Sequence, residues 1–223
     1  NLITGRNTIF IEDGAKVRFS ILNAETGPIY IGRNAEIMEG SLLRGPISIG
    51  ENAVVKMGTK MYGATSIGPH CVAGGEIKNS VLIGYSNKAH DGYLGDSVIG
   101  EWCNLGAGTS NSNLKNTASM VKVWVRNNNN YRIVGNKCGL IMGDYSRSAI
   151  NTSFNTGTIV GICCNIFGHF PEKFIKDFNW GDQQYKFEKA ISDIRNWKKF
   201  KNKKVTDREI AILKNLYHSK QSL

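Results

Sequence analysis

The sequence predicts an all-β solenoid, a parallel β-helix of six-residue repeats with an inserted β-hairpin loop and a C-terminal helical tail. Three observations support this fold class. Apolar residues recur every six positions along much of the chain, 25 Gly stand against only 4 Pro, and a basic segment with helical spacing follows the repeats. A period of six fits neither an α-helix nor an alternating strand, and abundant Gly indicates many turns that need positive φ.

The repeat consists of three runs of large or apolar positions. Their members are Ile31, Ile37, Leu43, Ile49, Val55, Met61 and Ile67, then Tyr93, Ile99 and Leu105, then Met142, Ser148, Phe154, Val160 and Ile166. We expect each short strand to turn one such side chain inward. Three sides then form a triangular coil of about eighteen residues, and successive coils stack about 4.8 Å apart. Three runs in one pattern argue against a β-sandwich with chance spacing.

Interruptions of the repeat are where function is expected, because regular positions serve the core. The phase shifts at 73–77 and again at 89–93. The repeat is then lost over a longer stretch, within which we place a hairpin insertion at about 117–140. Its turn is the polar run 126–130, rich in Asn that tolerates turn geometry. We expect this hairpin to extend out from the solenoid.

The solenoid is predicted to end after Ile166, with the aromatic-rich stretch 167–181 covering its last coil. The predicted domains are therefore 1–181, the β-helix, and 182–223, a basic helical tail. The longest apolar runs are far shorter than a membrane span, and the first residues lack signal-peptide features, so no membrane partner is expected. Five Cys without metal-ligand spacing indicate reduced thiols in a cytoplasmic protein.

The tail holds most of the net charge of +10. Residues 183–223 contain eleven Lys/Arg and four Asp/Glu, a balance of +7. We expect one helix at about 184–200 and a second from Thr206, which forms a capping box with Glu209. A basic tail is more often a solvated helical face than a nucleic-acid site. We therefore expect no nucleic-acid partner, and salt-dependent DNA or RNA binding stays a minor alternative.

Residues 88–96 (KAHDGYLGD) and 99–109 (IGEWCNLGAGT) carry a specific resemblance. They resemble the C-terminal half of the bifunctional N-acetylglucosamine-1-phosphate uridyltransferase / glucosamine-1-phosphate acetyltransferase. They are closer still to sugar nucleotidyltransferases with the same two-domain plan, whose N-terminal nucleotidyltransferase domain has no counterpart here. The resemblance implies a left-handed winding, an exception to the usual right-handed crossover. It also implies a homotrimer with active sites shared between neighbouring subunits, acetyl-CoA as co-substrate, no metal, and a small-molecule sugar substrate.

The resemblance assigns the catalytic roles to His90 and Asn104. His90 matches the general base that deprotonates a sugar amine before it attacks the thioester. A His titrates near neutrality and suits this task without any family argument. The thioester is already activated, so no covalent acyl-enzyme is needed. The alternatives are a loop histidine at His90 and an asparagine ladder along the coil edge at Asn104.

The binding roles fall on five further residues. Lys78, in the run GEIK at 75–78, and Lys60 match the ligands of a sugar phosphate, and Tyr93 matches a substrate contact. Asn113 and Ala107 match positions near acetyl-CoA. The alternatives are an inward core position for Tyr93 and solvated surface charges for both Lys.

The sequence also departs from the family pattern. Asp91 and Gly92 replace an apolar-Thr pair, and the run at 110–115 differs from the family's. The first hypothesis is therefore an acyltransferase domain acting on an amino sugar or sugar phosphate. The alternative is a catalytically silent trimerisation or regulatory module of a nucleotidyltransferase.

Overall fold

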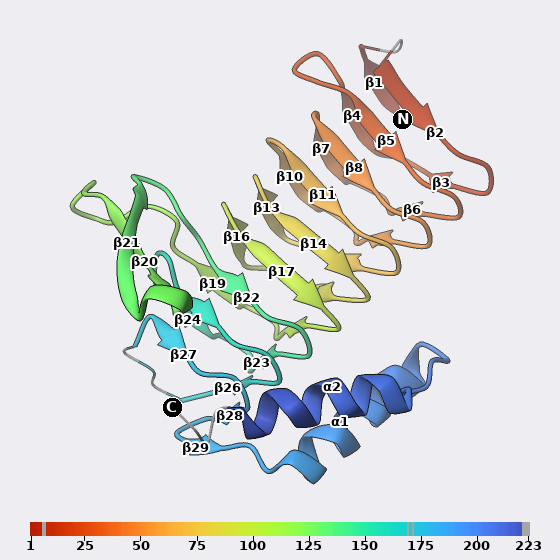
Figure 1. The fold of residues 1–223 in the computed structure, drawn as a ribbon. Helices are drawn as coiled ribbons and strands as arrows, with labels where there is room; N and C mark the ends of the chain where they lie inside the picture. The colour runs from red at the N-terminus through yellow and green to blue at the C-terminus, as the bar shows by residue number, and fades with distance from the viewer. Residues whose placement is uncertain (6–7, 169, 171, 220–223) are drawn as a thin grey trace.

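The computed structural model describes residues 1–5, 8–168, 170 and 172–219, and Figure 1 shows a stack of short parallel strands with two helices along one side. The predicted parallel β-solenoid is confirmed. Each coil has three sides, and each side contributes to one long parallel sheet. We call these sheets A, B and C in chain order.

Sheet A contains β1 (Leu2–Thr4), β4 (Ile21–Asn23), β7 (Leu42–Arg44), β10 (Lys60–Tyr62), β13 (Glu76–Lys78) and β16 (Tyr93–Gly95), and β19 (Ser110–Asn111) pairs with β24 (Ser153–Phe154) separately. Sheet B contains β2 (Ile9–Ile11), β5 (Ile29–Ile31), β8 (Ile47–Ile49), β11 (Thr65–Ile67), β14 (Val81–Gly84), β17 (Val98–Glu101), β22 (Ile141–Met142), β25 (Ile159–Val160) and β27 (Phe174–Ile175). Sheet C contains β3 (Lys16–Val17), β6 (Glu36–Ile37), β9 (Val54–Val55), β12 (Val72–Ala73), β15 (Asn87–Lys88), β18 (Asn104–Leu105), β23 (Arg147–Ser148), β26 (Asn165–Ile166), β28 (Asn179–Trp180) and β29 (Gln183–Gln184).

The predicted inward positions form the core, with one exception. The first run, from Ile31 to Ile67, is buried throughout, and the third run is buried as well. The exception is Tyr93, which the sequence places inward. Its neighbour Leu94 is 1% exposed and fills the core instead, in register with Ile77. The prediction was wrong because the inward residues Leu94 and Ile99 are five positions apart and not six.

The hairpin insertion is formed by β20 (Val121–Val125), the 3₁₀ turn η2 (Arg126–Asn128) and β21 (Asn130–Gly135). It does not extend away from the solenoid as expected. Val121 is fully buried, and Trp124 stacks on Phe174 at 5.6 Å between ring centroids. Arg126 forms an ion pair with Asp177 at 2.5 Å. These contacts fold the hairpin onto the last coils of its own chain.

The solenoid continues beyond Ile166, contrary to the prediction. β27 and β28 pair in parallel with β25 and β26 and so add a further partial coil. The pairing of β28 with β29 then occupies 183–184, which is why α1 (Phe187–Phe200) begins three residues later than expected. α2 (Asp207–His218) begins at the predicted capping box, which is confirmed. The domain boundary at 181/182 stays a prediction.

The helical tail packs on a column of aromatic residues at the corner between sheets B and C. His70, Tyr85 and Trp102 occupy equivalent corner positions with positive φ. Their rings stack at 4.6 and 4.3 Å between centroids. The ammonium of Lys198, in α1, lies 5.0 Å from the Trp102 ring, and Lys198 is 5% exposed. The prediction of a solvated basic face is therefore wrong for Lys198, whose charge is stabilised by aromatic rings.

The Lys198 ammonium also pairs with Glu209 of α2, which accepts a further hydrogen bond from Tyr145 of the solenoid. Lys201 donates to the carbonyl of His70 at 2.7 Å. These contacts join the two helices to each other and to the coils. Neither helix is long and apolar enough to span a bilayer.

Candidate functional site

The outer face of sheet A carries two polar columns, because residues two apart on a strand point to the same side. One column consists of Lys60, Glu76 and Tyr93, which are partners in register on β10, β13 and β16. The other column includes Tyr62 and Lys78. Three residues that the sequence assigned to substrate binding, Lys60, Lys78 and Tyr93, therefore lie on one face of the solenoid.

Tyr93 and Asn113 are brought into contact. The Asn113 side-chain amide donates to the Tyr93 hydroxyl at 3.1 Å and also to the Asp96 carboxylate. A Cβ on Gly95 would come within 2.2 Å of the Tyr93 hydroxyl, so glycine at this position leaves room for the ring. Partial burial, with Asp96 and Glu76 nearby, raises the pKa of Tyr93. Its phenol is therefore a neutral hydrogen-bonding group at physiological pH.

Glu76, in the first column, is hydrogen-bonded to the second column. The Tyr62 hydroxyl donates to the Glu76 carboxylate at 2.6 Å, and this bond raises the pKa of Tyr62 to about 12. The ammonium of Lys78 lies 5.5 Å from the Tyr62 ring centroid. The face thus offers carboxylate, phenol and ammonium groups, the types that bind sugar hydroxyls and phosphates.

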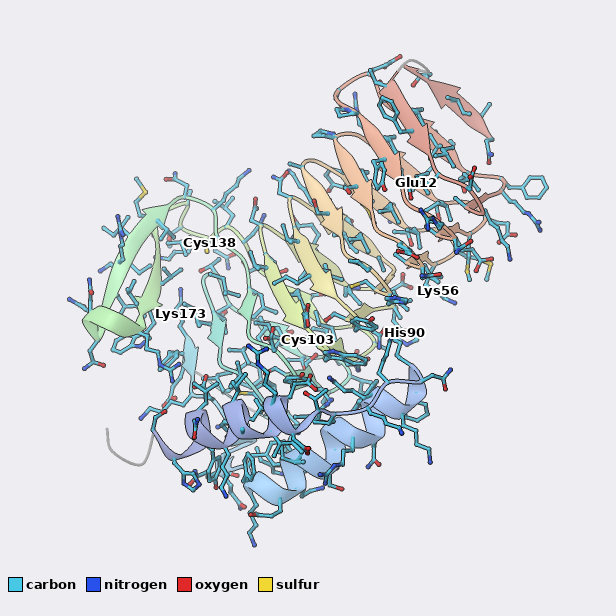
Figure 2. The ribbon with its side chains drawn as sticks, turned by 45° about the vertical axis from the view of Figure 1, so that its right-hand side comes forward. Glu12, Lys56, His90, Cys103, Cys138 and Lys173 are labelled. Carbon is cyan, nitrogen blue, oxygen red and sulfur yellow. The ribbon has the colours of Figure 1, made fainter. Side chains whose placement is uncertain are left out.

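His90 lies beside this face, at the corner that leads from sheet C to sheet A. Figure 2 shows it at the same edge of the solenoid as Lys56. Its side chain is exposed, and among the described residues nothing hydrogen-bonds to its ring. The same corner supplies Asp91 and Gly92 to a groove of about 340 Å³ that also borders Lys60, Glu76 and Tyr93. His90 is therefore adjacent to an open groove lined by polar side chains.

Asn104 is not brought to this face. It lies on sheet C, where its side-chain oxygen accepts a hydrogen bond from Asn87 at 3.3 Å. Asn104 is in register with Arg147, whose guanidinium stacks on Trp197 of α1 at 5.2 Å. Asn87 and Asn104 thus form a short asparagine ladder on sheet C, and the next residue in register, Arg147, is covered by α1.

Ala107 lies at the equivalent corner one coil beyond His90. The two corners are joined by a hydrogen bond from the Gly108 N–H to the Asp91 carbonyl at 3.0 Å. The Ala107 carbonyl accepts from the Asn151 N–H at 2.7 Å, while its own N–H has no acceptor within the described part of the chain. This corner therefore has an unpaired backbone donor one coil beyond His90.

Four further residues were given no role in the sequence analysis. Glu76 was quoted only as part of a motif, and Tyr62 and Asp96 carried no signal beyond being polar. Lys88 does carry a sequence signal. It stands six residues after Leu82 and six before Leu94, which is an inward position where a lysine is unexpected. Among the described residues, no cluster of three or more His, Cys, Asp or Glu side chains is suited to hold a metal ion.

This chain has relatives among known proteins. It is 34% identical over 171 residues to a bifunctional sugar-1-phosphate nucleotidylyltransferase/acetyltransferase of Sulfurisphaera tokodaii, a match that covers 75% of this chain and 40% of that protein. The resemblance to this bifunctional type is confirmed. The protein named bifunctional protein GlmU of Methanocaldococcus jannaschii is 37% identical over 89 residues, 40% of this chain and 21% of that protein. The GlmU protein of Methanococcus aeolicus is 36% identical over 88 residues, 39% of this chain and 20% of that protein.

The match thus spans less than half the length of each of these relatives. No protein-family model matches the chain. A hexapeptide transferase family protein from Anaplasma phagocytophilum aligns over all of this chain and 92% of its own, with 16% identity and a TM-score of 0.32. At that score the likeness carries no conclusion.

Proposed function

We propose that this chain is an acyltransferase domain that transfers an acetyl group from acetyl-CoA to an amino sugar or sugar phosphate. The observation that carries the proposal is the 34% identity, over 75% of this chain, to a protein named as a sugar-1-phosphate nucleotidylyltransferase/acetyltransferase. The polar face of sheet A supports it, because Lys60, Lys78 and Tyr93 stand together there beside the corner that carries His90.

In this proposal the chain binds and orients the sugar on sheet A. The ammonium groups of Lys60 and Lys78 attract the phosphate. Glu76 and the Tyr93 hydroxyl contact sugar hydroxyls, and Asn113 fixes the direction of the phenol. His90 accepts the proton that the sugar ammonium must lose before its nitrogen can attack a carbonyl.

Acetyl-CoA, when bound, supplies an acyl group that is already activated as a thioester. The chain's contribution is a donor for the oxyanion that develops at the thioester carbonyl. The free N–H of Ala107 is in a suitable place, one coil beyond His90. Asn104 is on sheet C, so in this proposal it contacts acetyl-CoA and not the sugar.

We further propose a homotrimer, in which neighbouring solenoids pack through sheet B. Val81, Val98 and Ile141 are in register along its outer face and are 38%, 42% and 36% exposed. An apolar column of this kind is typical of a surface that a second chain covers. Light scattering after gel filtration tests it, since a monomer would contradict the trimer.

The alternative function is a catalytically silent assembly module. The observation in its favour is that, within the described residues, nothing orients the His90 ring, whereas general bases are usually held by a third group. Calorimetric titration of acetyl-CoA into the 223-residue chain separates the two. We expect binding near one site per chain for the acyltransferase. A folded chain without detectable binding would contradict it and leave the assembly module.

A further inference from the structure

A lysine is buried inside the solenoid directly behind the His90 corner. Lys88 is 1% exposed and occupies the inward position of β15, in register with Ala73 of β12. Desolvation lowers the pKa of Lys88 to about 8. Its ammonium donates to the carbonyl of Gly74 at 3.1 Å and to the carbonyl of His90. A charge is costly to bury, so its presence here calls for a physical reason.

Other coils fix the same corner by a different device. The residue before each sheet A strand is usually Ser or Thr, whose hydroxyl donates to corner carbonyls. The Ser20 hydroxyl donates to the Met38 carbonyl at 3.1 Å. The hydroxyls of Ser41 and Thr59 donate to the Lys56 carbonyl at 3.0 and 2.6 Å. Small hydroxyl groups thus satisfy corner carbonyls that point into the structure.

The two coils at the groove lack this hydroxyl. Gly75 and Gly92 stand directly before β13 and β16, at the positions that Ser20, Ser41 and Thr59 hold elsewhere. No side chain fits there: a Cβ on Gly75 would lie 2.8 Å from the His90 carbonyl oxygen, and one on Gly92 would lie 2.1 Å from the Thr109 carbonyl oxygen. Both glycines line the groove.

Lys88 reaches this corner from inside. Its ammonium donates to the Gly74 carbonyl, which is equivalent to the Met38 and Lys56 carbonyls, and also to the carbonyl of His90. Within the described residues, its ammonium is the hydrogen-bond donor that reaches the His90 carbonyl, since no backbone N–H does so. We propose that Lys88 is the positioning residue of this site, holding the main chain that presents His90 while Gly75 and Gly92 keep the groove open. The catalytic part of this inference rests on the proposed function, and the structural part does not.

Lys88→Met tests the inference, because methionine suits an inward apolar position but cannot donate. The matched control is Leu105→Met, at the inward position of β18 and without loss of an ammonium. We expect exchange of the Gly108 and Glu76 amides, which donate to the Asp91 and Gly92 carbonyls of this segment, to accelerate about tenfold or more in Lys88→Met alone, with a melting temperature unchanged or raised. Unchanged exchange would overturn the inference.

The second arm is kinetic, with acetyl-CoA and glucosamine 1-phosphate as probes. We expect kcat to fall about tenfold or more in Lys88→Met, with less than about a twofold change in the sugar KM, because the sheet A ligands stay in place. Lys88→Gln retains a hydrogen-bond donor, so its exchange rate and its kcat should lie closer to those of the unaltered chain. This variant also keeps the test possible if Lys88→Met fails to fold. Equal loss in the Gln and Met variants, or an unchanged kcat, would contradict a positioning role.

The two proposals fail in different ways. Absence of transfer by the unaltered chain would contradict the proposed function, and the exchange measurement would still decide whether Lys88 holds the corner. Transfer by the unaltered chain, together with normal exchange and normal kcat in Lys88→Met, would contradict the role of Lys88 only.

Discussion

The side-chain amide of Asn113 donates to the hydroxyl of Tyr93 at 3.1 Å, across 20 residues of sequence. The contact forms because Tyr93 begins β16 on the outer face of sheet A, while Asn113 follows β19 in the next coil. The sequence assigned Tyr93 to the sugar and Asn113 to acetyl-CoA. Their contact places the two proposed binding regions side by side, as a transfer between them requires.

Replacing Asn113 should weaken the binding of acetyl-CoA. Asn113→Ala removes the amide that orients Tyr93 and contacts Asp96. We expect the dissociation constant to rise about tenfold, equivalent to about 1.4 kcal/mol, when measured by calorimetry. Asn116→Ala, at an exposed position three residues on, is the control and should bind normally. An unchanged constant in Asn113→Ala would remove this residue from the site.

The hydrogen bond between Tyr62 and Glu76 should be visible in a titration. It raises the pKa of Tyr62 from 10.0 to about 12, because the protonated phenol donates a hydrogen bond to the carboxylate of Glu76. We expect Glu76→Gln to return the Tyr62 pKa toward its ordinary value, measured by the absorbance change on phenol ionisation. Tyr62→Phe identifies the signal by removing it. A titration unaffected by Glu76→Gln would contradict the contact.

The packing of the helical tail on the solenoid should weaken at acid pH. Burial raises the pKa of Glu209, but hydrogen bonds from Lys198, Thr206 and Tyr145 outweigh it and lower the pKa to about 2. A depressed carboxyl pKa stabilises the fold above the unfolded value of about 4.3. The contribution is lost as pH falls from there toward 2.

We therefore expect hydrogen exchange in α2 to accelerate between about pH 4 and pH 2. In Glu209→Gln the protection should already be reduced at neutral pH and should change less on acidification. Glu188→Gln, in the first turn of α1, is the control for loss of a helical carboxylate. Equal acid dependence in the Glu209→Gln chain and the unaltered chain would contradict the role of Glu209.

The aromatic column should contribute strongly to stability. Trp102 is 7% exposed, stacks on Tyr85 and lies under the ammonium of Lys198. We expect Trp102→Ala to lower the free energy of unfolding by about 3 kcal/mol, measured by urea denaturation. Phe200→Ala removes an aromatic ring that is 84% exposed and should change it by less than about 0.5 kcal/mol. Similar losses in both variants would show that the column does not hold the tail.

Much of the solenoid follows from periodicity alone. The runs 31–67 and 142–166 are regular, and their inward side chains are the ones predicted. Periodicity failed at Tyr93 because the spacing between inward residues varies, being four from Ala73 to Ile77 and five from Leu94 to Ile99, so a fixed spacing of six assigns the wrong neighbour. The packing of the tail was not predictable. It depends on corner residues such as Trp102, whose position three residues after an inward aliphatic residue does not indicate what packs on them.

The site was predictable only where a motif repeats a known pattern. The motif gave Tyr93 and Lys78, which the fold places on one face. It gave no role to Lys88, because a lysine at an inward position has no meaning until the glycines beside it are seen to lack a hydroxyl. Asn104 lies on sheet C because it belongs to β18, the strand before the corner, whereas Lys78 and Tyr93 belong to strands of sheet A.

The proposed activity is the transfer of an acetyl group from acetyl-CoA to an amino sugar or sugar phosphate. The most direct measurement is detection of the N-acetylated product by mass spectrometry after incubation with acetyl-CoA and a panel of amino-sugar phosphates, with His90→Gln and His218→Gln in parallel. The account predicts product from the unaltered chain and from His218→Gln, and a rate lowered about 100-fold or more in His90→Gln. No product from a folded chain, or equal rates in all three proteins, would contradict it.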